Sequence, residues 1–262
     1  MTVGEFPRRV AIVMPCLNSA SHLIKVINAF LLQELQQKCL IIVDGKSTDE
    51  SHAIIADFSE KNSEIIWVRE ADTGISNALN IAMSKIENND IWGYLGADDI
   101  LLPGALLNVQ KHFQTIPSLN GVYFDSYSQP AGSGPLLRRC PELPFTLPSL
   151  ISVGTIVGLQ NIYLDGALVK RYGFNEAAKY SMDYELYLRL THDGYIQFVH
   201  IPQPSTVNIA EGNISSRYAM HANLEALGFA KKTAGWDLVL IGRYTRHYAG
   251  TLLKWLFNLV KR

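Results

Sequence analysis

The chain has 262 residues, 48% of them hydrophobic, and a formal net charge of -1. Such a composition supports a sizeable core and excludes intrinsic disorder, and the near-neutral charge excludes a general nucleic-acid binder. The three cysteines are scattered, without zinc-ligand spacing or a disulfide framework, so we expect a reducing cytoplasm. The start of the chain carries no apolar signal-peptide core, and no uncharged apolar run reaches membrane-spanning length.

The first half of the chain alternates between strand and helix patterns. Apolar runs predict buried strands at residues 9–14, 39–43, 65–68 and 91–95. The first of these is expected to stop at Pro15. Apolar residues at helical spacing predict helices between these strands, the first of them capped by Ser19 or Ser21, and Pro103 opens another. This alternation predicts βαβ units and a mainly parallel sheet.

Polar side chains follow the ends of these strands. They are Asn18, Asp44, Asp72, Asp98 and Asp99. Parallel sheets bind ligands beyond the carboxyl ends of their strands, so these groups are expected to gather at one edge. Two adjacent carboxylates after a strand are suited to holding a hydrated divalent cation against a phosphate. Taken singly, each Asp also fits an ordinary polar turn.

Two nucleotide-binding motifs are excluded. Residues 45–47 (G-K-S) look like the end of a P-loop, but Leu40 occupies the place of its opening glycine. No G-x-G-x-x-G follows the first strand, which argues against a dinucleotide fold. A nucleotide would therefore be held by carboxylates and a metal.

The second half carries one further segment of interest. Residues 121–125 predict a strand, and residues 129–148, rich in Pro and Gly, predict a long irregular connection. Ser181 is the expected N-cap of the next helix, which puts Asp183 in its first turn. Taken by itself, an acid there complements the helix dipole.

Five segments of the chain together resemble the GT-A glycosyltransferases of family 2. They are residues 14–18 (M-P-C-L-N), 41–51 (I-I-V-D-G-K-S-T-D-E-S), 72–80 (D-T-G-I-S-N-A-L-N), 96–99 (G-A-D-D) and 183–190 (D-Y-E-L-Y-L-R-L). The fourth resembles the family's DxD metal motif. The resemblance implies an α/β fold of GT-A type, with a Rossmann-like mixed, mainly parallel sheet flanked by helices and a C-terminal helical extension.

The resemblance implies a role for each residue of the donor side. Asp44 would contact the nucleobase, usually uracil, and Asn18 and the backbone near Pro15 would line the same pocket. Asp98 would touch the ribose or the donor sugar. Asp99 would bind Mg²⁺ or Mn²⁺, which bridges the diphosphate of the donor.

Further residues would complete the site. Asp72, Gly74 and Asn77 would shape the wall beside the donor. Asp183 would be the catalytic base, with Glu185 as the second candidate. The chain departs from the family at residues 158–161 (G-L-Q-N), where a His-Gln pair is common, and at residues 212–216 (G-N-I-S-S), where a G-G-I-S loop is common.

The activity implied is inverting transfer of a sugar from a nucleoside diphosphate donor, expected to be a UDP-sugar, to an acceptor hydroxyl. A lipid-linked or surface-polysaccharide precursor is the expected acceptor. The chain lacks Q-x-x-R-W, the mark of processive synthases, so a single transfer per encounter is expected. A nucleotidyltransferase and a non-catalytic nucleotide-sugar-binding scaffold remain as alternatives.

The expected organisation is one GT-A domain followed by a tail. Residues 1–125 would form the nucleotide-sugar-binding half and residues 126–235 the acceptor half. Residues 236–262 predict a basic amphipathic helical tail. This tail would either pack on its own domain or lie on the cytoplasmic face of the inner membrane.

Overall fold

The structure is a computed structural model that describes residues 7–130, 132–194, 196–209, 218–235, 239 and 242. Within these residues the strands form one sheet in the order β3-β2-β1-β4-β8-β6-β9-β5, and β7 pairs with β6. The loop at residues 212–216 lies outside the described residues, as does the predicted tail apart from residues 239 and 242. Within the described part of the chain, no helix combines the length and hydrophobicity that crossing a bilayer requires.

The first half forms the βαβ units that the alternating pattern predicts. Its strands are all parallel: β1 (Val10–Cys16), β2 (Lys38–Asp44), β3 (Ile65–Arg69) and β4 (Ile91–Tyr94). The connecting helices are α1 (Ala20–Leu31), α2 (Ser51–Lys61), α3 (Ile75–Ala82) and the short η1 (Met83–Lys85).

The second half extends the same sheet with mixed pairing. Its strands are β5 (Ile100–Leu101), β6 (Gly121–Gln129), β7 (Leu136–Arg138), β8 (Ile162–Asp165) and β9 (Phe198–Ile209). Its helices are α4 (Ala105–Thr115), α5 (Leu147–Val153), η2 (Leu159–Asn161), α6 (Gly166–Tyr172), α7 (Met182–His192) and α9 (Ala219–Ala234). Strand β8 runs antiparallel to β4 and β6, whereas β9 runs parallel to β6. The expected mixed α/β fold is confirmed.

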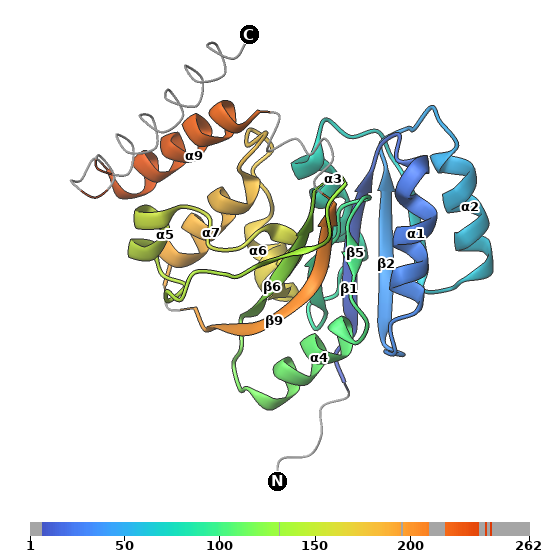
Figure 1. Cartoon of the computed structure of the whole chain (residues 1–262), viewed down its shortest axis with the longest axis horizontal. Helices are drawn as coiled ribbons and strands as arrows, with labels where there is room; N and C mark the ends of the chain where they lie inside the picture. Colours follow the sequence, from blue (N-terminus) through green and yellow to red (C-terminus); the bar gives the residue numbers. More distant parts are fainter. Residues whose placement is uncertain are drawn as a thin grey trace.

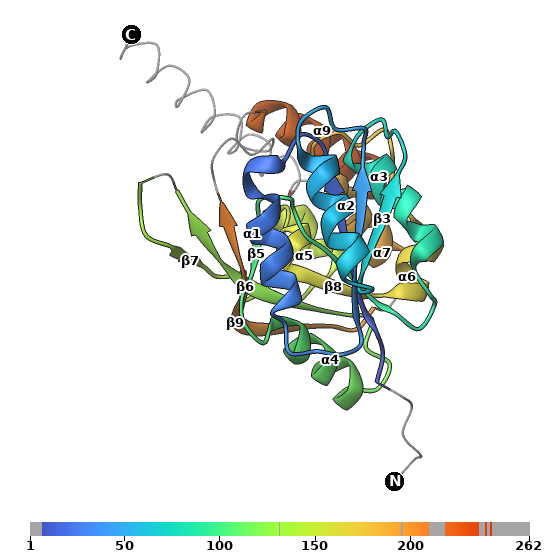
Figure 2. The ribbon, with the colours of Figure 1, turned by 90° about the vertical axis from the view of Figure 1, so that its right-hand side faces the viewer.

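Helices cover both faces of the sheet (Figures 1 and 2). Along β1, Ala11 and Val13 pack in the core that includes residues of α3, α5 and α7. Val10 and Ile12 pack in the other core, with residues of α1 and α4. Because successive strand residues point to opposite faces, a wholly apolar strand serves both cores. Polar loops follow the carboxyl ends of these parallel strands, and they carry the predicted site residues Asn18, Asp72, Asp98 and Asp99.

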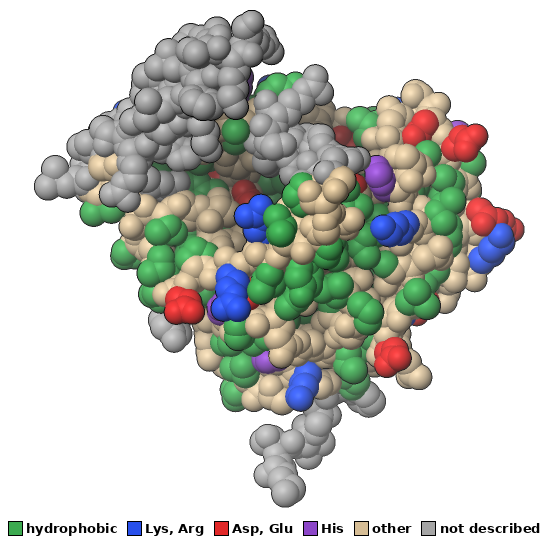
Figure 3. All heavy atoms as spheres, viewed as in Figure 1, with side chains coloured by type: hydrophobic (Ala, Val, Ile, Leu, Met, Phe, Trp, Pro, Cys, Tyr) green, Lys and Arg blue, Asp and Glu red, His purple; other side chains and the backbone are tan. Residues whose placement is uncertain are grey.

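The surface carries no block of charge of one sign on the face seen in Figure 3. Acidic and basic side chains are scattered among hydrophobic and polar ones over the described part of that face. The described part of this face thus shows the mixture of charges expected for a chain with a net charge of -1.

Two local predictions were wrong. Strand β1 does not stop at Pro15 but continues to Cys16. Pro15 pairs with Val43 of β2, while β4 ends opposite Val13, so the missing N–H of Pro15 leaves no β4 ladder bond unmade. The connection at residues 129–148 is not irregular throughout, because β7 within it pairs with β6 as a hairpin.

Candidate active site

The loops after β1 and β2 are built around two predicted donor residues. The side-chain oxygen of Asn18 accepts a hydrogen bond from the backbone N–H of Thr48 at 2.8 Å, and the backbone N–H of Asn18 donates to the Ser47 hydroxyl at 3.0 Å. Asn18 has a φ of 52°, a left-handed conformation that Asn tolerates. Asp44 is buried, and its Oδ1 accepts from the N–H of Ser47 at 2.8 Å. Asn18 and Asp44 therefore lie at one rim of the sheet, on neighbouring strands.

Asp49 fixes the starts of α1 and α2, the two helices beside this rim. Its carboxylate accepts hydrogen bonds from the N–H of Ala20 at 3.1 Å and of Ser51 at 2.9 Å. The N-cap position of α1 is Ser19, as predicted, but its side chain does not cap the helix. The hydroxyl of Ser19 instead donates to the Leu17 carbonyl at 3.3 Å. A carboxylate from the second loop thus replaces the local cap that the sequence pattern favours.

The loop after β3 joins the same rim. The Asp72 Oδ1 accepts from the N–H of Gly74 at 2.9 Å, and the Asn77 side chain accepts from the N–H of Thr73 at 3.1 Å. A side chain added at Gly45 would collide with the carboxylate of Asp72. Gly74 has a φ of 138°, which favours glycine. The second and third loops are therefore in contact through Asp72, next to Asp44.

The paired acids after β4 lie over the backbone of Gly96. A Cβ at Gly96 would stand 2.9 Å from Asp98 Oδ1 and 2.7 Å from Asp99 Oδ2. Asp99 is 8% exposed, and burial, together with the charge of Asp98, raises its pKa to about 6. The carboxylates of Asp98 and Asp99 approach one small space, and the charged form of Asp99 is disfavoured, which fits a divalent cation that would relieve this effect.

Asn208 is a site residue that sequence reasoning missed. It lies on β9, and its Nδ2 donates to Asp99 Oδ1 at 3.0 Å. Behind it, the Thr206 hydroxyl donates to the Asn161 side-chain oxygen at 2.6 Å, and both residues are buried. Asn208 stands in no motif and reaches Asp99 only because β9 folds back across 109 residues of chain.

Gly96 gives a test of how closely the acids must approach. We expect Gly96→Ala to displace the carboxylates of Asp98 and Asp99, because real Cβ contacts do not fall below 3.0 Å. Cation-dependent donor binding should weaken at least tenfold, while the melting temperature changes by only a few degrees. Isothermal titration with and without Mn²⁺ measures this. Gly134→Ala, at a position with open space around it, is the matched control.

Asp183 lies in the first turn of α7, as predicted. Its Oδ1 accepts from the N–H of Tyr184 at 2.7 Å, and burial raises its pKa to about 6. Burial raises the pKa of the Tyr94 hydroxyl, and the negative charges of Asp99, Asp98 and Asp183 raise it further. The Tyr94 hydroxyl, at the end of β4, therefore lies in the same region of the molecule as the paired acids after β4 and Asp183 in the first turn of α7.

The second candidate base, Glu185, is held in a different arrangement. Its carboxylate pairs with Arg189 one turn along α7, with an Nη2–Oε2 distance of 2.8 Å. Arg189 also donates to the carbonyls of Tyr172 at 2.7 Å and Gly173 at 2.9 Å. Through its pairing with Arg189, Glu185 thus helps to join α7 to the end of α6.

The start of α7 is fixed by α9. Ser181 occupies the predicted N-cap position, but its side chain makes no cap bond and donates to the Ala222 carbonyl at 2.8 Å. The carboxylate of Glu225 accepts from the N–H groups of Lys179, Tyr180 and Ser181, each at 2.8 Å. By accepting these hydrogen bonds, the side chain of Glu225 on α9 places the first turn of α7, and with it Asp183.

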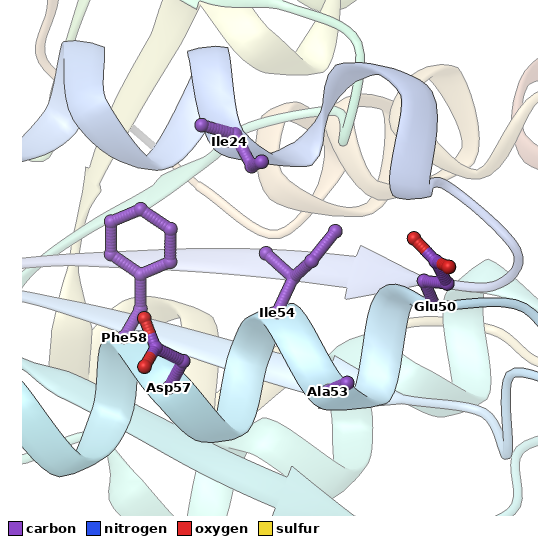
Figure 4. Close-up of a pocket in the computed structure, with 6 residues that line it drawn as sticks. All are labelled: Ile24, Glu50, Ala53, Ile54, Asp57 and Phe58. Carbon is purple, nitrogen blue, oxygen red and sulfur yellow. The ribbon is translucent and has the colours of Figure 1, made fainter.

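A groove of about 360 Å³ lies elsewhere, between α1 and α2 (Figure 4). Its apolar lining comes from Ile24, Ile54 and Phe58, with Glu50 and Asp57 beside them. None of the predicted donor, metal or catalytic residues lines this groove. The carboxylate cluster, rather than the groove, is the candidate active site.

Comparisons with known proteins show which family this chain resembles. The family model "Glycosyl transferase family 2" matches residues 11–149. The chondroitin synthase of Escherichia coli is 25% identical over 192 residues, which cover 73% of this chain and 27% of that protein. The chain therefore spans about a quarter of the length of that synthase.

Solved structures share the fold. Staphylococcus aureus TarS (residues 1–349) in complex with UDP-GlcNAc has a TM-score of 0.68 at 14% identity, covering 92% of this chain and 73% of that one. The mannosyltransferase PcManGT from Pyrobaculum calidifontis, in complex with GDP-Man and Mn²⁺, has a TM-score of 0.66 at 16% identity, covering 91% and 68%. With the family model matching more than half of its length, this chain belongs to glycosyl transferase family 2.

Proposed function

We propose that this protein transfers a single sugar, with inversion, from a UDP-sugar to an acceptor hydroxyl. The observation that carries the proposal is that the Asp98 and Asp99 carboxylates approach each other at Gly96, and that their charges and that of Asp183 all raise the pKa of the Tyr94 hydroxyl. A donor needs a cation site for its diphosphate and a base on the opposite side of the sugar carbon. The acids of β4 supply the first, and the acid of α7 supplies the second.

The donor would lie along the rim formed by the first three loops. Asp44 and Asn18, with the backbone near Pro15, would hold the nucleobase, and their positions at the ends of adjacent strands support this. Asp72, Gly74 and Asn77 form the neighbouring wall. The uridine assignment is supported by TarS, which was solved with UDP-GlcNAc, whereas PcManGT was solved with GDP-Man.

Asp99 would hold the cation, with Asn208 orienting its carboxylate. Mg²⁺ or Mn²⁺ bound there would neutralise the negative charge of the diphosphate. Asp98, on the same turn, would contact the ribose or the donor sugar. The neighbouring carboxylates of Asp98 and Asp99, together with the raised pKa of Asp99, are the features of this chain that favour a cation.

Asp183 would remove the proton from the acceptor hydroxyl as that oxygen attacks the anomeric carbon. A pKa of about 6 suits this step, because the carboxylate is ionised at neutral pH yet more basic than an ordinary Asp. The bond to the departing nucleoside diphosphate breaks as the new glycosidic bond forms. No covalent enzyme intermediate is required, because a single displacement inverts the carbon.

The acceptor we propose is a saccharide or lipid-linked saccharide precursor of a bacterial surface polysaccharide. The similarity to chondroitin synthase supports a saccharide acceptor.

A thermal-shift panel of nucleotide sugars, each with and without Mn²⁺, tests the donor assignment. A UDP-sugar should raise the melting temperature more than the matching GDP-sugar, and only with the cation. Mass spectrometry of the products on saccharide acceptors then identifies the transfer. A cation-independent shift, or a preference for GDP-sugars, would contradict the assignment.

Two alternatives give different products. A nucleotidyltransferase would release pyrophosphate, and a non-catalytic scaffold would bind the donor without breaking it down. The loop after β1 lacks the Gly-rich, basic sequence that the first usually needs. The placement of Asp183 in the same region as the paired acids favours an enzyme over a non-catalytic scaffold.

A further inference from the structure

We propose that Asp125, Cys140 and His200 form a second metal site, separate from the donor site and selective for Zn²⁺ or Co²⁺. One ligand atom from each of these side chains lies within 4.8 Å of the other two. The ligands come from β6, from the segment after β7, and from β9. Because 75 residues separate Asp125 from His200, no sequence spacing signals the site.

The geometry is close to that of a bound ion. Zinc bonds of about 2.0 Å to N and O and about 2.3 Å to S place tetrahedral ligand atoms roughly 3.3 to 3.6 Å apart. Asp125 Oδ1 and His200 Nε2 are 2.9 Å apart. Shifts on the order of 1 Å would therefore bring all three atoms to bonding positions, with the fourth position left for water.

The ligands are already held in place. Asp125 lies where the register between β6 and β9 shifts, and such irregularities re-aim a side chain. The N–H of Cys140 donates to Asp125 Oδ1 at 2.9 Å. The His200 ring stacks on Tyr123, with centroids 5.0 Å apart and planes at 13°. Supporting contacts of this kind orient the ligands of protein metal sites.

The chemistry of the three ligands determines which ion the site prefers. One thiolate, one imidazole and one carboxylate favour Zn²⁺ or Co²⁺, whereas Mg²⁺ and Mn²⁺ prefer oxygen ligands. The Cys140 thiol now donates to the Phe124 carbonyl at 3.2 Å. On binding, the thiol proton leaves to solvent and the sulfur turns to the metal. Burial, with the charge of Asp125, raises the Cys140 pKa to about 12, which argues against a free thiolate nucleophile here.

The site would fasten the acceptor half next to the proposed base. Cys140 lies between β7 and α5, and the ring of Phe145 in the same segment contacts both Tyr123 and Tyr187, at 5.6 and 5.2 Å. The charges of Asp183 and Cys140 both raise the pKa of the Tyr187 hydroxyl, which burial already raises. A metal at Cys140 would thus tie this segment to the sheet beside α7.

Titration of the full-length protein with Co²⁺ tests the proposal. Coordination by Cys140 should give a thiolate-to-cobalt charge-transfer band in the near ultraviolet, and Zn²⁺ should abolish it while excess Mn²⁺ should not. Cys140→Ser should remove the band. His200→Gln should keep the thiol but weaken Co²⁺ binding at least tenfold. The matched control Cys39→Ser, in buried strand β2, should leave the band unchanged.

The outcome of the cobalt titration is independent of the proposed transfer reaction. Asp99→Ala should lose cation-dependent donor binding yet retain the cobalt band, so a failure of either proposal is recognised separately. Circular dichroism tests whether Cys140→Ser is folded. If Cys140→Ser is not folded, His200→Gln takes its place as the test variant. Absence of a band in the unmodified protein, its persistence in Cys140→Ser, or undiminished affinity in His200→Gln would show a hydrogen-bonded cluster rather than a metal site.

Discussion

Replacement of Asp183 by Asn is expected to lower kcat by about 100- to 10,000-fold while donor affinity stays within about threefold. Asn keeps the size of the side chain and its acceptor oxygen, so the hydrogen bond from the Tyr184 N–H is retained. Only the ability to take a proton is lost. Steady-state kinetics gives the first quantity and isothermal titration with a UDP-sugar and Mn²⁺ gives the second.

The pH profile of kcat for the unmodified protein should report the ionisation of Asp183. A base must be ionised to act, and burial raises the pKa of Asp183 to about 6. The rate should therefore be constant above neutral pH and fall as the pH drops through about 6. An acid with an ordinary pKa would hold the rate down to about pH 4.

The effect on stability distinguishes a base from an acid that merely complements the helix dipole. Since the folded-state pKa is raised, the folded protein binds this proton more tightly than the unfolded chain. The stabilising contribution is present below about pH 4 and is lost as the pH rises through about 6. At pH 7, Asp183→Asn should therefore raise the melting temperature by about 2–6 °C. An acid whose main role is the helix dipole would show a fall instead.

Asp193→Asn is the matched control for the measurements of kcat and of melting temperature. This acid lies at the C-terminal end of the same helix and is exposed. A hydrogen bond to His192 lowers the pKa of Asp193. The substitution should leave kcat unchanged. Near-full activity of Asp183→Asn, or loss of its donor binding, would contradict the assignment of the base.

Much of the first half follows from the sequence because its signals are local. Each strand is a mainly apolar run followed by a polar loop, and several hydrogen bonds of these loops are made within a few residues. The Asp44 bond to the Ser47 N–H spans three residues, and the Asp72 bond to Gly74 spans two. Such contacts can be predicted from motif spacing alone.

The second half depends on pairings between distant segments. Strand β9 is half-buried over most of its length, and its two buried residues, Ser205 and Thr206, are polar, so its hydrophobic pattern is weak and it is positioned by pairing with β6 and β5. Asn208 reaches Asp99, and Glu225 reaches the start of α7, through this long-range arrangement. The side chain of Ser181 likewise bonds to distant Ala222, and at the start of α1 the distant Asp49 replaces the cap expected from Ser19.

Replacement of Asp99 by Ala is expected to abolish the cation dependence of donor binding. The carboxylate is buried, close to Asp98 and hydrogen-bonded to Asn208, so the substitution would remove the proposed ligand of the cation. Donor affinity in the presence of Mn²⁺ should fall at least tenfold, to the value measured without the cation. Titration of a UDP-sugar with Mn²⁺ and with EDTA measures both values.

Acidification should imitate this substitution in the unmodified protein. The pKa of Asp99 is raised to about 6, first by burial. A protonated carboxyl does not ligate the cation, so Mn²⁺-dependent donor binding should weaken as the pH falls through about 6 and be restored by more Mn²⁺. Binding without Mn²⁺ should change little over the same range.

Two further variants separate a ligand from a general loss of charge. Asn208→Ala removes the hydrogen bond to Asp99 but keeps the carboxylate, so we expect a smaller loss of affinity that excess Mn²⁺ overcomes. Asp57→Ala removes an exposed acid of α2 that pairs with Lys61, and it should leave donor binding unchanged. If Asp99→Ala instead bound the UDP-sugar with undiminished Mn²⁺ dependence, the cation would have to be held elsewhere. The paired acids after β4 would then be an ordinary polar turn, because the close approach of both carboxylates to Gly96 would serve no ion.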